Sequence, residues 1–327
     1  MALTKLNAVV IGCGAISSVH TAAIDAVGAN LKAVCDINPI KLNGKDNTYT
    51  DYIEMLDTVH PDVVHILTPH YLHAQMCIDA LQRGIHVVVE KPPAMTQTQF
   101  IQLNQAVNQS SAQLAVCFQN RLNAGVKQAL NLIKSGQLGN ITGALGLVYW
   151  KRDNAYYQSE SWRGTINEEG GGVLINQAIH TLDLITLLMG RPTVVNACAA
   201  NLCHQGVIEV EDCITVSLDY QNSIRATLMG CTFASVSRPV LLEIYTQNGT
   251  LSIYPQMAVV DKAQQLTPFE YTGKKEWGDG HTALISEFYS DIVNHKPTRH
   301  SLKNAANTMD TMFAIYRSVQ SGQPIKI

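Results

Sequence analysis

The chain has 327 residues, of which 46% are hydrophobic and 15% are charged, and its formal net charge is −3. This length exceeds the usual size of one hydrophobic core, so two domains are predicted. The near-neutral charge argues against nucleic-acid binding, and no apolar run approaches the ~18 residues of a membrane span. We expect neither nucleic acid nor membrane as a partner, and an early first strand without a secretory signal favours a cytoplasmic protein.

The eight cysteines form no CxxC pair, and most lie inside apolar runs. A reduced cysteine in such a run behaves as a small hydrophobic residue, so we interpret them as structural thiols. A zinc site is the weaker alternative, because no cysteine or histidine spacing supports it. No metal is predicted.

The first 120 residues alternate short β-branched runs with longer amphipathic segments. Strands are predicted at 6–11, 31–35, 63–67, 85–90 and 114–117, and helices at 16–27, 52–58, 72–83 and 97–108. Strands that alternate with helices imply right-handed crossovers. This half is therefore predicted to be an α/β domain with a doubly wound parallel sheet.

The pattern changes after residue 124. A helix at 124–135, a strand at 141–150, a polar aromatic loop at 151–172 and a helix at 173–189 are predicted. Strands then dominate at 194–203, 213–218, 224–233, 241–247 and 250–254, with a hairpin turn at Asn248-Gly249. Helices at 281–294 and 302–321 end the chain. Successive strands without helices predict an α+β domain on a largely antiparallel or mixed open sheet.

A glycine-rich turn directly follows the first predicted strand and opens the first helix. Gly12 permits a tight turn, and Gly14 lets the backbone approach a pyrophosphate at the helix N-terminus, where Ala15 and Ile16 follow. Ser17 stands where the dinucleotide fingerprint has its third small residue, so the match is imperfect. A helix-opening turn without a ligand is the alternative.

Asp36 ends the second predicted strand and is placed to accept a hydrogen bond from a ribose 2′-hydroxyl, which favours NAD. Lys41 suits a 2′-phosphate instead, so NADP stays open. The loop after the third strand carries Thr68, Pro69, His70 and His73, which we expect beside the nucleotide. The alternative for both histidines is that they cap and pack the following helix.

The β-branched run at 85–89 ends in Glu90-Lys91-Pro92. A buried parallel strand of this kind delivers the Lys91 ammonium to the sheet edge at which ligands bind. A surface lysine at a strand end is the alternative.

Together with the segment GGGVLINQAIHTLDL at 170–184, these motifs resemble the Gfo/Idh/MocA oxidoreductases over essentially the whole chain. The resemblance implies a Rossmann domain at 1–122 that holds NAD or NADP. A substrate-binding and oligomerisation domain would occupy 123–327, with the last helix able to pack back on the first domain. It also implies redox chemistry at a carbinol carbon of a sugar, polyol or sugar derivative, in a homodimer or homotetramer formed through the C-terminal sheet.

Family members commonly carry Asp-x-x-x-His on the helix after the glycine run, and the matching residues here are Asn176 and His180. This spacing places both on one helix face. An amide cannot transfer protons, so Asn176 is expected to orient a substrate hydroxyl. Proton transfer is then expected to depend on His180 and Lys91.

Oxidation of a secondary alcohol requires removal of its hydroxyl proton. An imidazole, with a pKa of about 6.5, can be the base directly, whereas a lysine at about 10.4 is too protonated. We predict that His180 is the general acid or base and that Lys91 donates to the same oxygen. Glu90 is expected to orient Lys91 or the nicotinamide ribose. The alternative for His180 is a buried histidine satisfied by a neighbour.

Predicted substrate contacts, besides Asn176, are Arg121, Tyr157, Trp162 and Arg163, because aromatic faces and arginines suit sugars and their anionic groups. Trp162 and Arg163 can equally brace their loop. Gly170-Gly171-Gly172 is interpreted as a turn rather than a phosphate site, and the acidic run 209–212 is expected on a solvated or intersubunit face. Two other functions remain open: an NAD-using glycoside hydrolase and a noncatalytic dinucleotide-sensing regulator.

Overall fold

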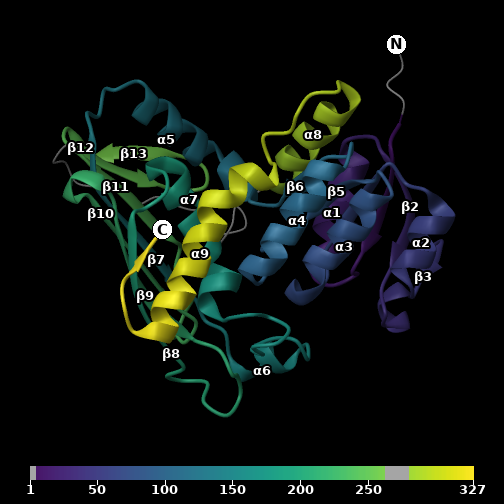
Figure 1. Cartoon of the computed structure of the whole chain (residues 1–327), viewed down its shortest axis with the longest axis horizontal. Coiled ribbons are helices and arrows are strands. Elements are labelled where there is room, and N and C mark those ends of the chain that lie inside the picture. The colour runs from purple at the N-terminus through teal and green to yellow at the C-terminus, as the bar shows by residue number, and fades with distance from the viewer. Residues whose placement is uncertain (1–4, 262–279) are drawn as a thin grey trace. The chain divides into compact units, whose positions relative to one another are not determined.

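The computed structural model describes residues 5–261 and 280–327 (Figure 1). They form two compact units, residues 5–119 with 280–305, and residues 120–261 with 306–327. Residues 280–305 were predicted in the second domain but fold with the first unit. Helix α8 (Gly280–Val293) buries Leu284, Ile285 and Phe288 and packs against α1 (Ser17–Ala26).

The first unit is built on a parallel sheet with strand order β3-β2-β1-β4-β5-β6. Its strands are β1 (Asn7–Ile11), β2 (Asn30–Cys35), β3 (Thr48–Tyr49), β4 (Val63–Ile66), β5 (His86–Val89) and β6 (Leu114–Val116). All neighbouring pairs are parallel, which confirms the predicted doubly wound sheet. The strand order reverses at β1 and β4, and ligands bind beyond the carboxyl ends of the strands at such a point.

The other helices of this unit are α2 (Tyr52–Val59), α3 (His70–Gln82) and α4 (Gln97–Gln109), and α3 packs against α4. The β-branched strand residues are almost wholly inaccessible to solvent, which explains why these apolar runs predicted strands correctly. Two local differences from prediction are the extra strand β3 and the start of α3 at His70 instead of residue 72. A two-residue strand has no periodicity to detect.

The second unit carries an eight-stranded sheet in the order β13-β12-β11-β7-β10-β9-β8-β14. Its strands are β7 (Ile141–Tyr149), β8 (Val194–Ala200), β9 (Cys213–Asp219), β10 (Arg225–Cys231), β11 (Leu241–Thr246), β12 (Gly249–Ile253), β13 (Ala258–Asp261) and β14 (Ile325–Lys326). β7 and β10 are parallel and the remaining pairs are antiparallel, which confirms the mixed sheet. β13 and β14 were not predicted.

Helices α5 (Ala124–Lys134), α6 (Asn154–Gln158), α7 (Ile179–Met189) and α9 (Leu302–Ser321) accompany this sheet, although α9 begins in the first unit. α7 packs on β7 and β10. Gly146 permits this close approach, because a Cβ there would lie 2.7 Å from Thr181 Cγ2. Within the described ranges, no helix is long and apolar enough to cross a membrane. All eight cysteines are free thiols, and Cys198 and Cys203 are exposed instead of lying in the core.

Candidate functional site

The glycine turn after β1 has the geometry that a dinucleotide requires. Gly12 adopts φ +95°, and a Cβ there would lie 2.7 Å from the Leu67 carbonyl oxygen, so only glycine fits. At Gly14, no atom of the described residues lies within 4 Å of an added Cβ, which leaves the backbone open to a ligand. The Ser17 hydroxyl donates to the Gly14 carbonyl at 2.7 Å and so fixes the turn. Ser17 therefore stabilises the turn from the position where the dinucleotide fingerprint has its third small residue.

Asp36 is anchored beside this turn, directly after β2. Its Oδ2 accepts from the Cys13 backbone N–H at 2.8 Å, and its Oδ1 accepts from the Asn38 N–H at 2.9 Å. The next residue, Ile37, is 84% exposed, and Ile40 is 75% exposed. A fixed carboxylate next to two exposed apolar side chains suits the ribose and adenine of a dinucleotide.

His73 links the loop after β4 to the loop after β5. Its Nδ1 lies 2.7 Å from the Pro92 carbonyl oxygen and its Nε2 lies 2.7 Å from the Thr68 carbonyl oxygen. Burial lowers the pKa of His73, so the neutral ring donates to one carbonyl at a time. His73 and His70 are both buried, as in the alternative that they pack the helix, while Thr68 and Pro69 are half-buried.

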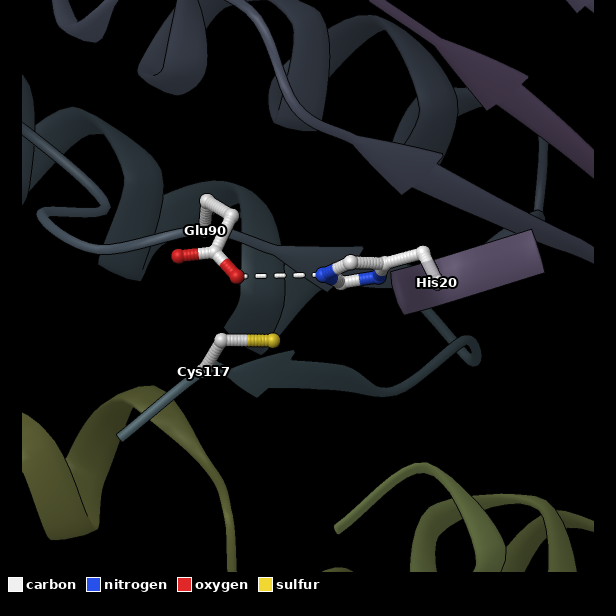
Figure 2. Close-up of side chains that lie close together, drawn as sticks. All are labelled: His20, Glu90 and Cys117. Carbon is white, nitrogen blue, oxygen red and sulfur yellow. Dashed lines mark hydrogen bonds and ion pairs between the residues drawn. The ribbon is translucent and has the colours of Figure 1, made fainter. Parts of the chain in front are cut away.

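Glu90 contacts the buried histidines His20 and His281, and Figure 2 shows its contact with His20. Its Oε1 lies 3.0 Å from His20 Nε2 and 3.2 Å from His281 Nε2, while Oε2 accepts from the Lys91 backbone N–H at 3.2 Å. Burial raises the pKa of the Glu90 carboxyl, but hydrogen bonds from the two histidines outweigh it and hold the pKa well below its usual range. Glu90 is therefore ionised, and it holds the backbone of Lys91.

The hydrogen bonds of this cluster continue to Tyr289. His20 Nδ1 lies 2.9 Å from His65 Nδ1, and His65 Nε2 lies 2.9 Å from the Tyr289 hydroxyl. Burial lowers the pKa of both histidines, so both rings are neutral. One set of donors and acceptors then satisfies all of these hydrogen bonds. The Tyr289 O–H donates to His65, His65 Nδ1–H donates to His20, and His20 Nε2–H donates to Glu90.

Ligand atoms of His20, Glu90 and Cys117 lie within 4.8 Å of one another, and such groups can bind zinc (Figure 2). However, burial and the Glu90 carboxylate raise the pKa of the Cys117 thiol well above its usual value. Zinc needs the thiolate, and the hydrogen bonds already account for the arrangement. We assign no metal to this cluster.

His180 lies near the start of α7, directly after a π-helical turn (Leu174–Ala178) where a continuous α-helix was predicted. Single π-turns inside helices are frequent at functional sites. The His180 side chain borders a cavity of about 40 Å³ that is also lined by Asn120, Trp150, Gln177 and Tyr254. Gln177 shares this cavity with His180, and its amide nitrogen also lies 3.4 Å from the Tyr156 hydroxyl, whereas the Asn176 amide donates to Glu169.

The glycine run before this helix is packed tightly. A Cβ on Gly171 would lie 2.0 Å from the Tyr316 hydroxyl, and one on Gly172 would lie 1.8 Å from the Glu211 carbonyl oxygen. The Glu211 carboxylate accepts from the backbone N–H groups of Gly172 and Leu174 at 2.9 and 3.1 Å. A protein carboxylate thus occupies the helix N-terminus, as expected for a turn and not for a phosphate site.

The prediction that the acidic run 209–212 lies on a solvated or intersubunit face is wrong for Asp212, whereas Glu211 is half-buried. Asp212 is 0% exposed and accepts from the N–H groups of Leu202, Cys203 and His204. Buried carboxylates of this kind satisfy backbone donors in irregular segments. The sequence shows no periodicity that would distinguish them from surface acids.

Glu169 was not predicted as a site residue, yet it contacts Asn176 directly. Its side chain is buried, and its carboxylate accepts from the Asn176 amide nitrogen and from the Gly164 backbone N–H. Burial raises the pKa of Glu169 to about 7, against the opposing effect of these two donors and of Arg163. The only sequence signal was an acidic residue immediately before the glycine run.

Tyr156 lies between two arginines. The Arg163 guanidinium is 4.3 Å from the centre of the Tyr156 ring and 4.8 Å from that of Trp162, and Arg152 is 5.1 Å from the Tyr156 ring. These stacked groups form a polar, aromatic wall beside Asn176, whose amide nitrogen lies 3.5 Å from the Tyr156 hydroxyl. Trp162 and Arg163 therefore lie together, which agrees both with the predicted contact to a substrate and with the alternative that they brace their loop.

The structure corrects the prediction for Tyr157. Its side chain is 5% exposed, its hydroxyl lies 2.9 Å from Thr232 Oγ1, and it packs with Ile208 and Val210. Because the short helix α6 turns adjacent residues to different sides, Tyr156 and not Tyr157 joins the wall.

Arg121 also has a different role from the predicted substrate contact. Its Nε and Nη2 donate to the two carboxylate oxygens of Asp183 at 2.8 and 2.5 Å, and Asp183 is 0% exposed. Thr308 Oγ1 donates to the same carboxylate at 2.7 Å. Arg121 thus forms a buried bidentate ion pair inside the second unit.

Two models of one family match the chain. Residues 6–118 match the oxidoreductase family NAD-binding Rossmann fold, and residues 126–252 match the GFO/IDH/MocA C-terminal domain. The crystal structure of the WlbA dehydrogenase from Bordetella pertussis, in complex with NADH and UDP-GlcNAcA, is similar with a TM-score of 0.88 and 26% identity over 99% of both chains.

Two curated relatives are sugar dehydrogenases. Levoglucosan dehydrogenase of Pseudarthrobacter phenanthrenivorans is 29% identical over 60% of this chain and 54% of its own length. D-glucoside 3-dehydrogenase of Escherichia coli is 31% identical over 59% of this chain and 57% of its own length. The chain thus matches little more than half the length of these relatives.

Proposed function

The chain belongs to the Gfo/Idh/MocA oxidoreductase family, and we propose that it is an NAD-dependent dehydrogenase or reductase. It moves a hydride between the nicotinamide and a secondary carbinol or carbonyl carbon of a sugar, polyol or sugar derivative. The observation that carries the proposal is the NAD-binding Rossmann unit joined in one chain to a second unit that retains His180 beside a cavity. The named activities of the two curated relatives support the same chemistry.

The glycine turn and Asp36 are proposed to hold the cofactor. Gly12 makes the tight turn, and its own N–H donates to the Cys35 carbonyl at 2.8 Å. Gly14, Ala15 and Ile16 then offer backbone N–H groups and the N-terminus of α1 to the pyrophosphate. Asp36, already oriented by two backbone donors, accepts from a ribose hydroxyl. When NAD is bound, its nicotinamide accepts the hydride.

Replacing Asp36 by serine is expected to weaken NAD binding by about tenfold, the scale of one charge-assisted hydrogen bond. NADP binding should weaken less or improve, because the carboxylate no longer repels a 2′-phosphate near Lys41. Titration calorimetry with both cofactors measures this, and the exposed Asp46→Ser is the matched control. An unchanged ratio of NAD to NADP affinity would remove Asp36 from the site.

Lys91 and His180 are proposed to handle the proton. In oxidation, His180 takes the hydroxyl proton, while the Lys91 ammonium donates to the same oxygen and stabilises its developing charge. The hydrogen bond from the Lys91 backbone to Glu90 fixes the point from which the lysine side chain extends. In reduction the roles reverse, and His180 returns the proton.

The wall formed by Tyr156, Trp162 and Arg163 is proposed to bind the sugar. Aromatic faces stack on the apolar side of a pyranose ring, and an arginine fork binds hydroxyl, carboxylate or phosphate oxygens. Asn176 is proposed to bind a substrate hydroxyl from the same side.

A screen of sugars, polyols and sugar derivatives at 340 nm, with NAD and NADP compared, tests the function. We expect NADH formation with at least one of these substrates. Release of aglycone from a nitrophenyl glycoside without net NADH would indicate a glycoside hydrolase. NAD binding without turnover of any compound would indicate a regulator.

A second copy of this chain is the proposed protein partner. Alternate residues of β7, β10 and β11 place Leu145, Leu147, Met229 and Leu241 on one sheet face, where Leu147 pairs with both Met229 and Leu241. These side chains are half-exposed, although apolar. A homodimer or homotetramer formed through this face would cover them.

Light scattering of the purified protein is expected to give the mass of a dimer or tetramer. Leu147→Arg should shift the mass towards the monomer, because it places a charge within the apolar face. Leu202→Arg, at a position 55% exposed outside this face, is the control. A monomeric wild-type protein would contradict the proposal.

A further inference from the structure

We propose that Glu169 is a positioning residue that sets the direction of the Asn176 amide. By binding the amide nitrogen, Glu169 turns the amide oxygen away from itself, so that Asn176 offers an acceptor to a substrate hydroxyl. This proposal rests on the proposed function, because the hydroxyl belongs to the sugar or polyol.

The hydrogen bonds around Glu169 fix the direction of the amide. An ionised carboxylate only accepts hydrogen bonds, and the neighbours of its two oxygens are the Gly164 backbone N–H and the Asn176 side chain. Gly164 can only donate, and an amide oxygen beside a carboxylate would be repelled, so Asn176 presents its NH₂ group. The oxygen then lies on the opposite side of the planar amide.

A second contact supports the same direction. The Tyr156 hydroxyl accepts from an Arg163 N–H, and the Asn176 and Gln177 amide nitrogens lie 3.5 and 3.4 Å from it. Glu169 is thereby joined through Asn176 and Tyr156 to the proposed sugar-binding wall. Position 176 carries an amide where family members commonly have an aspartate, and the carboxylate of Glu169 contacts that amide.

Other ionisable groups act on Glu169 from each neighbouring segment. Arg163, from its own loop, favours the ionised form, whereas Glu211, from the segment before β9, opposes it. The phenols of Tyr157 and Tyr316 also interact electrostatically with Glu169, and burial raises the pKa of both. Among these groups of the described residues, Arg163 is the cation and Glu211 is the second carboxylate that act on the buried Glu169.

The arrangement predicts a pH dependence. Burial raises the pKa of Glu169 to about 7, so protonation occurs as the pH falls through neutrality. A protonated carboxyl carries an O–H donor on one of its oxygens, and the oxygen that faces Asn176 is the one whose partner can accept, because the Gly164 N–H can only donate. That O–H favours the amide oxygen over the NH₂ group, so the amide loses its fixed direction. Activity should therefore decline below about pH 7, in a limb that depends on Glu169.

The free energy of unfolding should change with pH in the direction opposite to activity. Because the folded pKa lies above the value of 4.5 that is usual for glutamate, the folded state binds the proton more tightly than the unfolded state. Stability from this group is present at low pH and is lost as the pH rises towards about 7. Glu169→Gln should remove this dependence between pH 4.5 and about 7.

Three variants test the positioning role. Glu169→Gln can accept at only one of the two contacts, so we expect kcat to fall about tenfold or more. The part of the limb near neutral pH that depends on Glu169 should vanish, while the pH dependence that comes from the base His180 remains. Asn176→Asp places two carboxylates in contact, and a similar fall is expected. In the double variant the new glutamine NH₂ donates to the new carboxylate at position 176, and kcat should recover to within about threefold of wild type.

Glu168→Gln is the matched control, since it makes the same chemical change at the adjacent residue outside this hydrogen-bonded group. Wild-type kcat and pH profile in Glu169→Gln would overturn the proposal. Equal losses in all three variants would also overturn it, because a merely structural residue is not rescued by moving the carboxylate.

A measurement without turnover separates this proposal from the proposed function. The side-chain NH₂ signals of Asn176, assigned by their absence in Asn176→Asp, should shift in NMR spectra with an apparent pKa near 7 in wild type. They should not titrate in Glu169→Gln. If these signals do not change with pH in wild type, the proposed hydrogen bond between Glu169 and Asn176 is rejected, even if the protein oxidises sugars. A clear titration in a protein without dehydrogenase activity would leave Glu169 bound to Asn176 and reject the function.

Discussion

Lys91→Ala and His180→Ala are each expected to lose at least about two decades of turnover while still binding NAD. Without His180 the hydroxyl proton loses its proposed base, and without Lys91 the developing charge on the oxygen loses its ammonium. Initial rates at 340 nm measure the loss, and calorimetry measures NAD binding. The exposed residues Lys134 and His60 supply matched controls, and Lys134→Ala and His60→Ala should retain full turnover. Near-normal turnover in either test variant would reject the role assigned to that residue.

Chemical rescue can distinguish the two roles. Added imidazole should restore part of the turnover of His180→Ala, because it supplies a base of the right pKa, but should not help Lys91→Ala. Added methylammonium should do the reverse. Rescue of both variants by the same compound would mean that the two residues perform one shared function.

Asp183→Ala and Arg121→Ala are expected to cost about 3–5 kcal/mol of the free energy of unfolding, because each leaves one partner of a buried ion pair uncompensated. Replacing both by apolar residues, as in Arg121→Met with Asp183→Leu, should cost less than either single change. Urea unfolding followed by circular dichroism measures these differences.

The pair of Arg225 with Asp219 is the natural control. It has a similar N···O distance of 2.5 Å, but its side chains are 65% and 37% exposed. Breaking it should cost much less than breaking the Arg121–Asp183 pair, because solvent screens both charges. Similar costs for the two pairs would show that burial does not determine the energy of the Arg121–Asp183 pair.

Local sequence patterns predicted most of the fold. The β-branched runs and their intervening amphipathic segments identified five of the six strands of the parallel sheet, because burial on both faces leaves a continuous apolar signal. The glycine turn was recognisable because Gly12 has no alternative at its positive φ. Strands of two residues, such as β3 and β14, carry too little pattern to be found.

The parts that sequence reasoning missed depend on distant contacts. Arg121 and Asp183 are 62 positions apart, so nothing local distinguishes a buried partner from a substrate contact. Glu169 and Asp212 belong to residue types that are rarely buried, and their burial depends on backbone donors in loops. Residues 280–305 return to the first unit because the apolar side of α8 matches α1, a match that is not visible in either helix alone.

The most direct test of the proposed hydride transfer uses a substrate from the screen that carries deuterium on its reacting carbon. After turnover with NAD, the reduced cofactor is isolated and its mass is measured. We expect one deuterium atom in the NADH for each substrate molecule oxidised, since the hydride passes directly from carbinol carbon to nicotinamide. Product formed without deuterium in the reduced cofactor would contradict the proposed function.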